Sequence, residues 1–174
     1  RPGSRHEESF AEPIAPESAW PDLRDVVLIL SEAEKKVSSA EGHRFAETSE
    51  MFAGRLAAIP ERAARVRRAI LDRDLTALGE ASEADALSMH AVMMTSNPPL
   101  FYWSPRTLAA MEAVRAMRHR GLEAYFTIDA GPNVHVLTRA RDLVAVQEAL
   151  RAALDAPMLC CSPGPGAQRR ETAP

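Results

Sequence analysis

The apolar positions of this chain fall into short continuous runs and into stripes with the spacing of a helix. The run at 25–30 is apolar after its first residue, which is typical of a strand covered on at least one face. Three later strands are predicted at 123–128, 134–138 and 157–161. Four short strands with helices before and between them predict an α+β fold, in which a mostly antiparallel sheet has its helices packed on one face.

The longest stripe lies in the first half of the chain. Apolar side chains recur every three or four positions from Phe52 to Ile70, which predicts an amphipathic helix facing the sheet. Ser49 is its candidate N-cap, and Pro60 is expected to kink it or to open a second segment, because proline lacks the backbone donor. The polar residues 38–42 before it are predicted to form a loop.

Start and stop signals divide the second half into further helices. Asp74 is predicted to cap the next helix, and Ser104 followed by Pro105 combines a capping side chain with a proline suited to a first turn. Gly121 supplies the left-handed residue that ends a helix. A last helix is predicted over 142–154, before the final strand.

Composition and charge narrow the class of protein. The chain has 174 residues, 46% hydrophobic and 26% charged, as in one ordinary globular domain. Its formal charge of −3 gives no general attraction to nucleic acid, so no nucleic-acid partner is expected. No apolar run approaches the roughly 20 residues of a membrane span, and the first residues are polar. We therefore expect a soluble cytoplasmic protein without a membrane partner.

The positions of cysteine and histidine argue against a metal site. Cys160 and Cys161 are adjacent, so mutual pairing would be strained and no zinc-ligand spacing arises. They are expected to be buried, reduced residues of the last strand. The five histidines show no ligand spacing with cysteines or carboxylates, and His90 is interpreted as a structural residue. No protein-held metal is predicted.

One carboxylate stands at a position suited to chemistry. Residues 125–128 favour a strand, and Gly131, Pro132 and Asn133 favour a tight turn, so Asp129 is predicted at the end of that strand. Folds often place functional side chains at such positions. The alternative is that Asp129 only caps the turn through its own backbone.

The turn at 127–133 (TIDAGPN) resembles the T-x-D-A-G-P-N signature of diphosphomevalonate decarboxylases, members of the GHMP kinase superfamily. Further matches follow in the family's order along nearly the whole chain, which argues against coincidence. They are the segments at 15–24 (APESAWPDLR), 34–36 (EKK), 38–42 (SSAEG), 47–49 (ETS), 89–91 (MHA), 98–102 (PPLFY) and 163–166 (PGPG).

The resemblance implies the ferredoxin-like C-terminal domain of an enzyme with two lobes. Such enzymes use ATP and Mg²⁺ to phosphorylate the 3-hydroxyl of mevalonate diphosphate, and then release phosphate and CO₂ to give isopentenyl diphosphate. Their Gly/Ser-rich phosphate loop belongs to the N-terminal lobe, and this chain shows none. ATP and Mg²⁺ are therefore expected to bind mainly to a preceding lobe, and this half alone is expected to be inactive. The domain is expected at 21–162, after an irregular lead-in at 1–20 and before a Pro/Gly/Arg-rich tail at 163–174.

The same resemblance assigns candidate site residues. Asp129 takes the catalytic position, where a fixed carboxylate orients the tertiary hydroxyl or accepts its proton. Ser39 matches a serine that contacts substrate phosphate, although turn formation is its alternative role. Ala130 lets the backbone approach the substrate. Lys35 and Lys36 are weaker candidates for phosphate contact, because lysines after a buried strand are usually solvated.

Two other functions stay open at this point. Ala40 stands where bacterial relatives have arginine and others threonine, so a GHMP mevalonate kinase or a phosphomevalonate decarboxylase is one alternative. A non-catalytic half-domain that acts as a binding module is the other. A homodimer is the further partner that the sequence leaves open.

Overall fold

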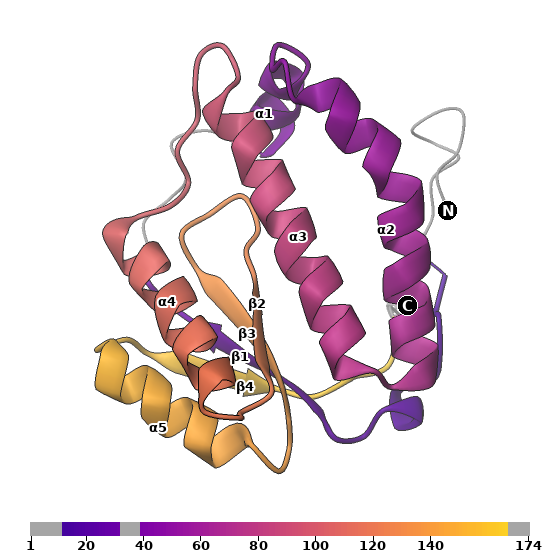
Figure 1. Cartoon of the computed structure of the whole chain (residues 1–174), viewed down its shortest axis with the longest axis vertical. Helices are drawn as coiled ribbons and strands as arrows, with labels where there is room; N and C mark the ends of the chain where they lie inside the picture. Colours follow the sequence, from indigo (N-terminus) through magenta and orange to yellow (C-terminus); the bar gives the residue numbers. More distant parts are fainter. Residues whose placement is uncertain (1–11, 32–38, 167–174) are drawn as a thin grey trace, which may run out of the picture.

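Four antiparallel strands form one sheet in the order β2-β3-β1-β4 (Figure 1). The structure is a computed structural model that describes residues 12–31 and 39–166, with the side chains of 39–41 outside the description. The strands are β1 (Leu23–Leu28), β2 (Ala124–Thr127), β3 (Val134–Arg139) and β4 (Met158–Cys161). A 3₁₀ turn at Glu17–Ala19 precedes β1, and the helices are α1 (Ser39–Ala46), α2 (Phe52–Asp72), α3 (Leu75–Met94), α4 (Pro105–His119) and α5 (Leu143–Ala153).

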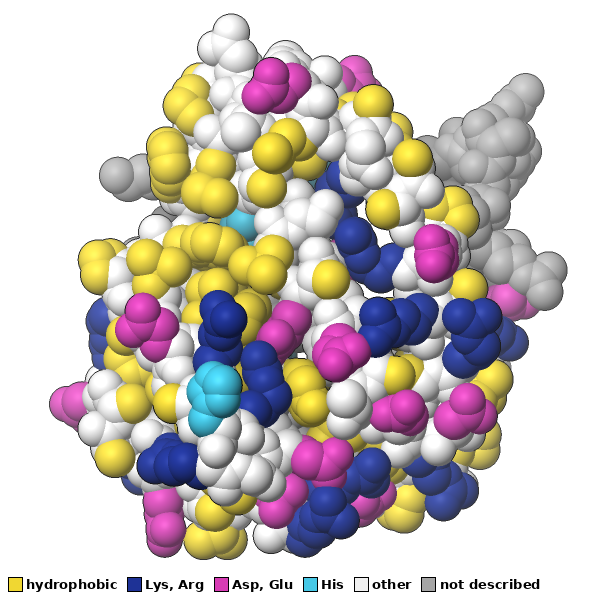
Figure 2. Space-filling model, in the orientation of Figure 1, with side chains coloured by type: hydrophobic (Ala, Val, Ile, Leu, Met, Phe, Trp, Pro, Cys, Tyr) yellow, Lys and Arg dark blue, Asp and Glu magenta, His cyan; other side chains and the backbone are white. Residues whose placement is uncertain are grey.

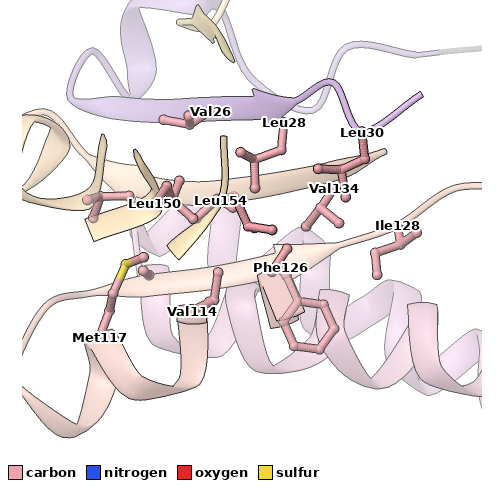
Figure 3. Packing of buried hydrophobic residues seen from close by; sticks show 14 of the residues in the cluster. Val26, Leu28, Leu30, Val114, Met117, Phe126, Ile128, Val134, Leu150 and Leu154 are labelled. Carbon is pink, nitrogen blue, oxygen red and sulfur yellow. The ribbon is translucent and has the colours of Figure 1, made fainter. Parts of the chain in front are cut away.

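Helices α4 and α5 close one face of this sheet. Val26 pairs with Val136 and Leu28 with Val134, so these four buried residues share a face. Figure 3 shows how side chains of the two helices reach them and Phe126 of β2. The helical contribution to this cluster comes from Ala110, Val114 and Met117 of α4, from Val146 and Leu150 of α5, and from Ala86 of α3. The prediction of an antiparallel α+β sheet with helices on one face is confirmed.

Helix α3 packs along β2, an outermost strand, and α2 lies against α3 (Figure 1). The approach is close at Gly79, where an added Cβ would lie 2.0 Å from Cγ of Tyr125. Further along, Glu83 accepts a hydrogen bond from the Phe126 amide (3.0 Å) and pairs with Arg118 of α4 (2.6 Å). Helix α3 therefore runs in the direction of β2 and brings its C-terminal turns to the residues that follow this strand.

Three local predictions in the first half of the chain need correction. Residues 39–42 open α1 and do not form a loop; of these residues, Ala40 and Glu41 are good helix formers. Ser49 does not cap α2, because the N-cap is Met51; the Ser49 hydroxyl instead accepts a hydrogen bond from the Met51 amide (3.1 Å). Helix α2 continues through Pro60 as one helix, so no second segment opens there.

The other start and stop signals are confirmed. Asp74 caps α3, and its Oδ1 accepts a hydrogen bond from the Ala77 amide (2.9 Å). Ser104 forms a capping box with Thr107 around the start of α4. Gly121, with φ of +87°, follows the end of that helix. Short-range chemistry was therefore sufficient to place these boundaries.

The exposure of the cysteines differs from the prediction. The prediction that Cys160 and Cys161 are buried is wrong: both thiols are free, and both residues are exposed. The reason is that β4 is an outermost strand, and the core takes in Met158 but neither cysteine. Among the described residues, no helix is both long enough and apolar enough to cross a membrane.

Candidate functional site

Asp129 lies two residues beyond β2, in the turn that leads to β3. The Gly131 amide donates a hydrogen bond to the Asp129 carbonyl (2.7 Å), which closes a tight turn. The Asp129 residue itself is exposed, whereas Ile128 before it and Gly131 after it are buried. The sequence thus predicted its place correctly, at the end of the strand.

Asn133 ties this turn to the end of β1. Its Oδ1 accepts hydrogen bonds from the amides of Leu30 (2.8 Å) and Ser31 (3.1 Å), more than a hundred residues earlier in the chain. These two amides lie just beyond β1, so one side-chain oxygen satisfies both of them. The turn is therefore fixed to the central part of the sheet.

Thr107 ties the same turn to α4. Its hydroxyl donates to the Pro132 carbonyl (2.9 Å), and its residue is fully buried. The threonine is itself held by the capping box, in which the Thr107 amide donates to the Ser104 hydroxyl (3.1 Å). The first turn of α4 thus supplies a second, independent anchor for the Asp129 turn.

His90, near the C-terminal end of α3, is buried beside the aromatic residues that precede α4. Its ring is 1% exposed and lies 4.7 Å from the Trp103 ring and 5.9 Å from the Tyr102 ring, centroid to centroid. Burial lowers the pKa of His90, while the backbone of Ile128 and Asp129 and the Asp129 carboxylate oppose this shift. The ring is therefore a close neighbour of the predicted catalytic residue.

Asp129 is one of the described acids without a cationic partner, unlike Asp85 close by. Among the described residues no ion pair involves its carboxylate. A pocket of about 460 Å³ lies nearby between α2, α3 and β2; Thr127 lines it, but Asp129 does not. In that pocket Arg55 (2.9 Å) and Arg62 (2.8 Å) both pair with Asp85. Burial would raise the pKa of Asp85, but the two arginines outweigh this effect and lower the pKa.

The structure describes the other predicted site residues to different extents. Ala130 adjoins Asp129 in the turn and is half-buried. Ser39 is the first residue of α1, and its side chain lies outside the description. Lys35 and Lys36 lie outside the described residues. Where the structure describes the chain, no three His, Cys, Asp or Glu side chains are arranged to hold a metal ion.

Sequence reasoning missed the residues that hold Asp129. Asn133 was interpreted only as a turn former, and Thr107 was not singled out. A polar side chain at the third position of a capped helix was the available signal for Thr107. No local signal could show that Asn133 reaches the end of β1, because this contact depends on the tertiary fold.

The fold and this turn define a ferredoxin-like α+β domain with a carboxylate fixed at one end of its sheet. Residues 25–161 match the family described as "Mevalonate 5-diphosphate decarboxylase C-terminal domain". The chain belongs to this family. A curated relative, the diphosphomevalonate decarboxylase mvd1 of Aspergillus fumigatus, is 36% identical over 161 residues, which cover 88% of this chain and 40% of that protein.

Solved structures share the fold as well. The structure described as "MDDEF in complex with MVAPP" matches with a TM-score of 0.89 and 37% identity, over 98% of this chain and 54% of that chain. The structure described as "MDDEF in complex with MVAPP, AMPPCP and Magnesium" matches with a TM-score of 0.87 and 37% identity, over 94% and 51%. The chain therefore spans about half the length of these solved proteins.

Proposed function

We propose that this chain is the C-terminal lobe of an ATP-dependent diphosphomevalonate decarboxylase. The enzyme would convert mevalonate diphosphate and ATP into isopentenyl diphosphate, CO₂, ADP and phosphate. Family membership supports this proposal, and so does the likeness to structures described with MVAPP, AMPPCP and magnesium. The observation on which it rests is the Asp129 carboxylate, fixed at the end of the sheet without an ion pair among the described residues.

In this proposal Asp129 orients and deprotonates the 3-hydroxyl of the substrate. The oxygen of that hydroxyl takes the terminal phosphoryl group of ATP, and the carboxylate accepts the hydroxyl proton. The C3–O bond then breaks and phosphate leaves with the electron pair, so positive charge develops at C3. The C1–C2 bond breaks to release CO₂, and its electron pair forms the C2–C3 double bond. A fixed negative charge beside C3 stabilises the cationic state between these events.

The remaining binding roles belong to the same proposal. Ser39 and Ala130 would contact the substrate, with Lys35 and Lys36 as weaker candidates for its phosphates. ATP and Mg²⁺ are assigned to the rest of the enzyme, in line with the absence of a metal-ligating cluster in the described residues. Because Asp129 is exposed here, the same remaining part would supply the opposite wall of the cleft.

The proposal is tested by Asp129→Asn in the full-length enzyme. The amide keeps the size of the side chain but removes its charge and basicity, so kcat should fall by about 10²–10⁴-fold. The KM for mevalonate diphosphate should change by no more than about threefold, because the binding groups stay in place. The exposed Asp72 at the end of α2 provides the matched control, and Asp72→Asn should keep wild-type turnover. Near-normal turnover of Asp129→Asn would remove the proposed role.

Ala40 favours a second candidate, an enzyme that acts on a substrate with fewer phosphates. The resemblance leads us to expect arginine or threonine at this position, and alanine lacks the donor that either side chain would supply. Turnover of mevalonate, its monophosphate and its diphosphate by the full-length protein separates the candidates. Decarboxylation of the diphosphate as the best substrate supports the first; preference for either smaller substrate supports the second.

Compartment and assembly complete the proposal. We place the enzyme in the cytoplasm, which fits the lack of a membrane-crossing helix in the described part of the chain. We also propose that two copies associate as a homodimer. Sedimentation velocity of the full-length protein checks this, and a single monomeric species across the concentration range would contradict it.

A further inference from the structure

We propose that Tyr102 is a positioning residue, which fixes the first turn of α1 and with it the place of Ser39. The inference rests on the proposed function, because Ser39 is the residue that would contact a phosphate of the substrate. It also gives a role to the motifs at 47–49 and 98–102, which that proposal leaves without one. Its support comes from a close approach, from packing and from hydrogen bonds at the other end of the helix.

Helix α1 passes close to Tyr102 at Gly42. A Cβ added to this buried glycine would lie 2.8 Å from the Tyr102 hydroxyl oxygen, whereas the nearest atoms of Leu100 and Met93 would be 3.8 and 3.9 Å away. Real Cβ atoms essentially never lie within 3.0 Å of another such atom, so the hydroxyl can approach this closely only because residue 42 has no side chain. Ser39 lies three residues earlier, which is less than one turn of a helix. The hydroxyl therefore meets α1 within one turn of the proposed phosphate contact.

The ring of Tyr102 is itself held in place. It packs against a buried cluster that joins α1, the end of α3 and the loop before α4, formed by Ala46, Val92, Met93 and Leu100. It also meets the buried His90 ring nearly edge-on, at 75° and with 5.9 Å between the ring centroids. A ring with neighbours from two helices has little freedom to move. The hydroxyl therefore cannot swing away to admit a larger side chain at residue 42.

Hydrogen bonds fix the other end of α1, which lies beside the C-terminal end of α3 (Figure 1). The Thr48 hydroxyl, just beyond α1, accepts a hydrogen bond from the Asn97 amide (2.7 Å). One residue on, the hydroxyls of Ser49 and Thr95 lie 2.6 Å apart. Asn97 and Tyr102 both belong to the loop between α3 and α4, so one loop holds α1 near both of its ends. Two separate contacts fix the direction of the helix as well as its position.

This arrangement determines which kinetic constant depends on Tyr102. Because Ser39 is proposed to bind a phosphate of the substrate, a shift of α1 weakens substrate binding. The turn that carries Asp129 is anchored separately, by Asn133 and Thr107. A displaced α1 should therefore raise the KM for mevalonate diphosphate and leave kcat and the KM for ATP almost unchanged.

The test compares Gly42→Ala with the double variant Gly42→Ala/Tyr102→Phe in the full-length enzyme. The methyl group of alanine meets the tyrosine hydroxyl, so α1 must shift, and the KM for mevalonate diphosphate should rise by about tenfold, as for the loss of one hydrogen bond to a charged group. The change in kcat should stay below about threefold. Phenylalanine removes the clashing oxygen, so the double variant should recover most of the rise in KM. Melting temperatures recorded alongside check that each variant is folded.

Two single variants complete the comparison. Tyr102→Phe alone leaves a gap beside Gly42, which loosens the contact with α1 and should raise the KM by about threefold. Gly54→Ala is the matched control, because a Cβ there meets nothing within 4 Å, and it should keep the wild-type KM. Wild-type KM in Gly42→Ala or in Tyr102→Phe would overturn the inference. A double variant no better than Gly42→Ala, or a loss of kcat in place of a rise in KM, would do the same.

Ser39→Ala separates this inference from the proposed function. If Ser39→Ala keeps the wild-type KM for mevalonate diphosphate, the proposed role of Ser39 fails. If its KM rises while Gly42→Ala keeps the wild-type value, the inference alone fails.

Discussion

The carboxylates at the two ends of the sheet have different partners. At the end where β2 begins, Arg139 pairs with Asp22 (3.1 Å) and Glu123 (3.0 Å) and donates to the carbonyl of Arg73 (3.0 Å). Arg141 pairs with Glu123 as well. Figure 2 shows acidic and basic side chains side by side at the lower end of the molecule, around the start of α3 and the end of α4.

At the opposite end of the sheet, Asp129 lies in an anchored turn and has no cationic partner among the described residues. Neutral groups of Asn133 and Thr107 hold the turn. Asp129 has no ion pair within the described part of the chain. An arginine at this place would stabilise the carboxylate but would also compensate its charge and reduce its basicity. The difference indicates that ion pairs stabilise the fold at one end of the sheet. At the other end, hydrogen bonds of Asn133 and Thr107 with the backbone anchor the turn and leave the charge of Asp129 uncompensated.

The largest expected effect on stability comes from Gly79→Ala. This residue lies in the half of α3 near the end of the sheet where Arg139 pairs with Asp22 and Glu123. The new Cβ would lie 2.0 Å from Cγ and 2.4 Å from Cβ of Tyr125, so α3 and β2 must separate. We expect a loss of about 3 kcal/mol in the free energy of unfolding. Gly54→Ala is the control, since a Cβ there meets nothing within 4 Å and should stabilise α2 by about 0.5–1 kcal/mol. Chemical denaturation measures both, and equal stability of the two variants would contradict the close approach of α3.

Asn133→Ala should affect both stability and turnover. It leaves the amides of Leu30 and Ser31 without their acceptor, which should cost about 2 kcal/mol. Because the Asp129 turn loses its anchor to β1, kcat should fall by about tenfold or more. Asn133→Asp keeps an acceptor oxygen and should retain more stability than alanine. If urea denaturation ranks the two variants in the reverse order, the proposed anchor is wrong.

Thr107→Val should have a smaller effect of the same kind. Valine keeps the shape of threonine but removes the hydroxyl that donates to the Pro132 carbonyl, for an expected loss of about 1 kcal/mol. Thr107→Ser keeps the hydroxyl and serves as the control. Steady-state kinetics of the full-length variants should show lower kcat for valine than for serine. A valine variant as active as wild type would show that this hydrogen bond does not position the turn.

The smallest expected effect concerns the pair formed by His135 and Asp25 on the open face of the sheet. Nδ1 of His135 lies 2.8 Å from Oδ2 of Asp25, and this hydrogen bond raises the pKa of His135 against the opposing effect of burial. The pair therefore stabilises the fold fully below 6.5, the ordinary pKa, and loses this contribution as the pH rises through the raised pKa. The difference in melting temperature between wild type and His135→Gln should shrink from about pH 6 to about pH 9. A difference that grows over this range would contradict the assignment.

Sequence patterns were sufficient where the physics is local. The Asp74 cap, the Ser104–Pro105 start and the Gly121 stop each depend on a few neighbouring residues, and all three were predicted correctly. The place of Asp129 at the end of a strand was local as well, because strand formers and turn formers meet there.

Predictions failed where neighbours in space decide the outcome. The cysteines were expected to be buried because strands of this composition usually are, but β4 lies at the edge of the sheet. Residues 39–42 were assigned to a loop from their polarity, although they open α1. In the same way, the role of Asn133 depends on the order β3-β1 in the sheet, which no single segment of the sequence specifies.

The most direct test compares two exchanges of a carboxylate for an amide in the full-length enzyme, Asp129→Asn and Glu123→Gln. Each is characterised by its melting temperature and by its kcat with mevalonate diphosphate. We predict that Asp129→Asn keeps the melting temperature and loses turnover, whereas Glu123→Gln, which breaks the pairs with Arg139 and Arg141, lowers the melting temperature and keeps turnover. Equal losses of turnover in both variants, or wild-type turnover in Asp129→Asn, would contradict the account.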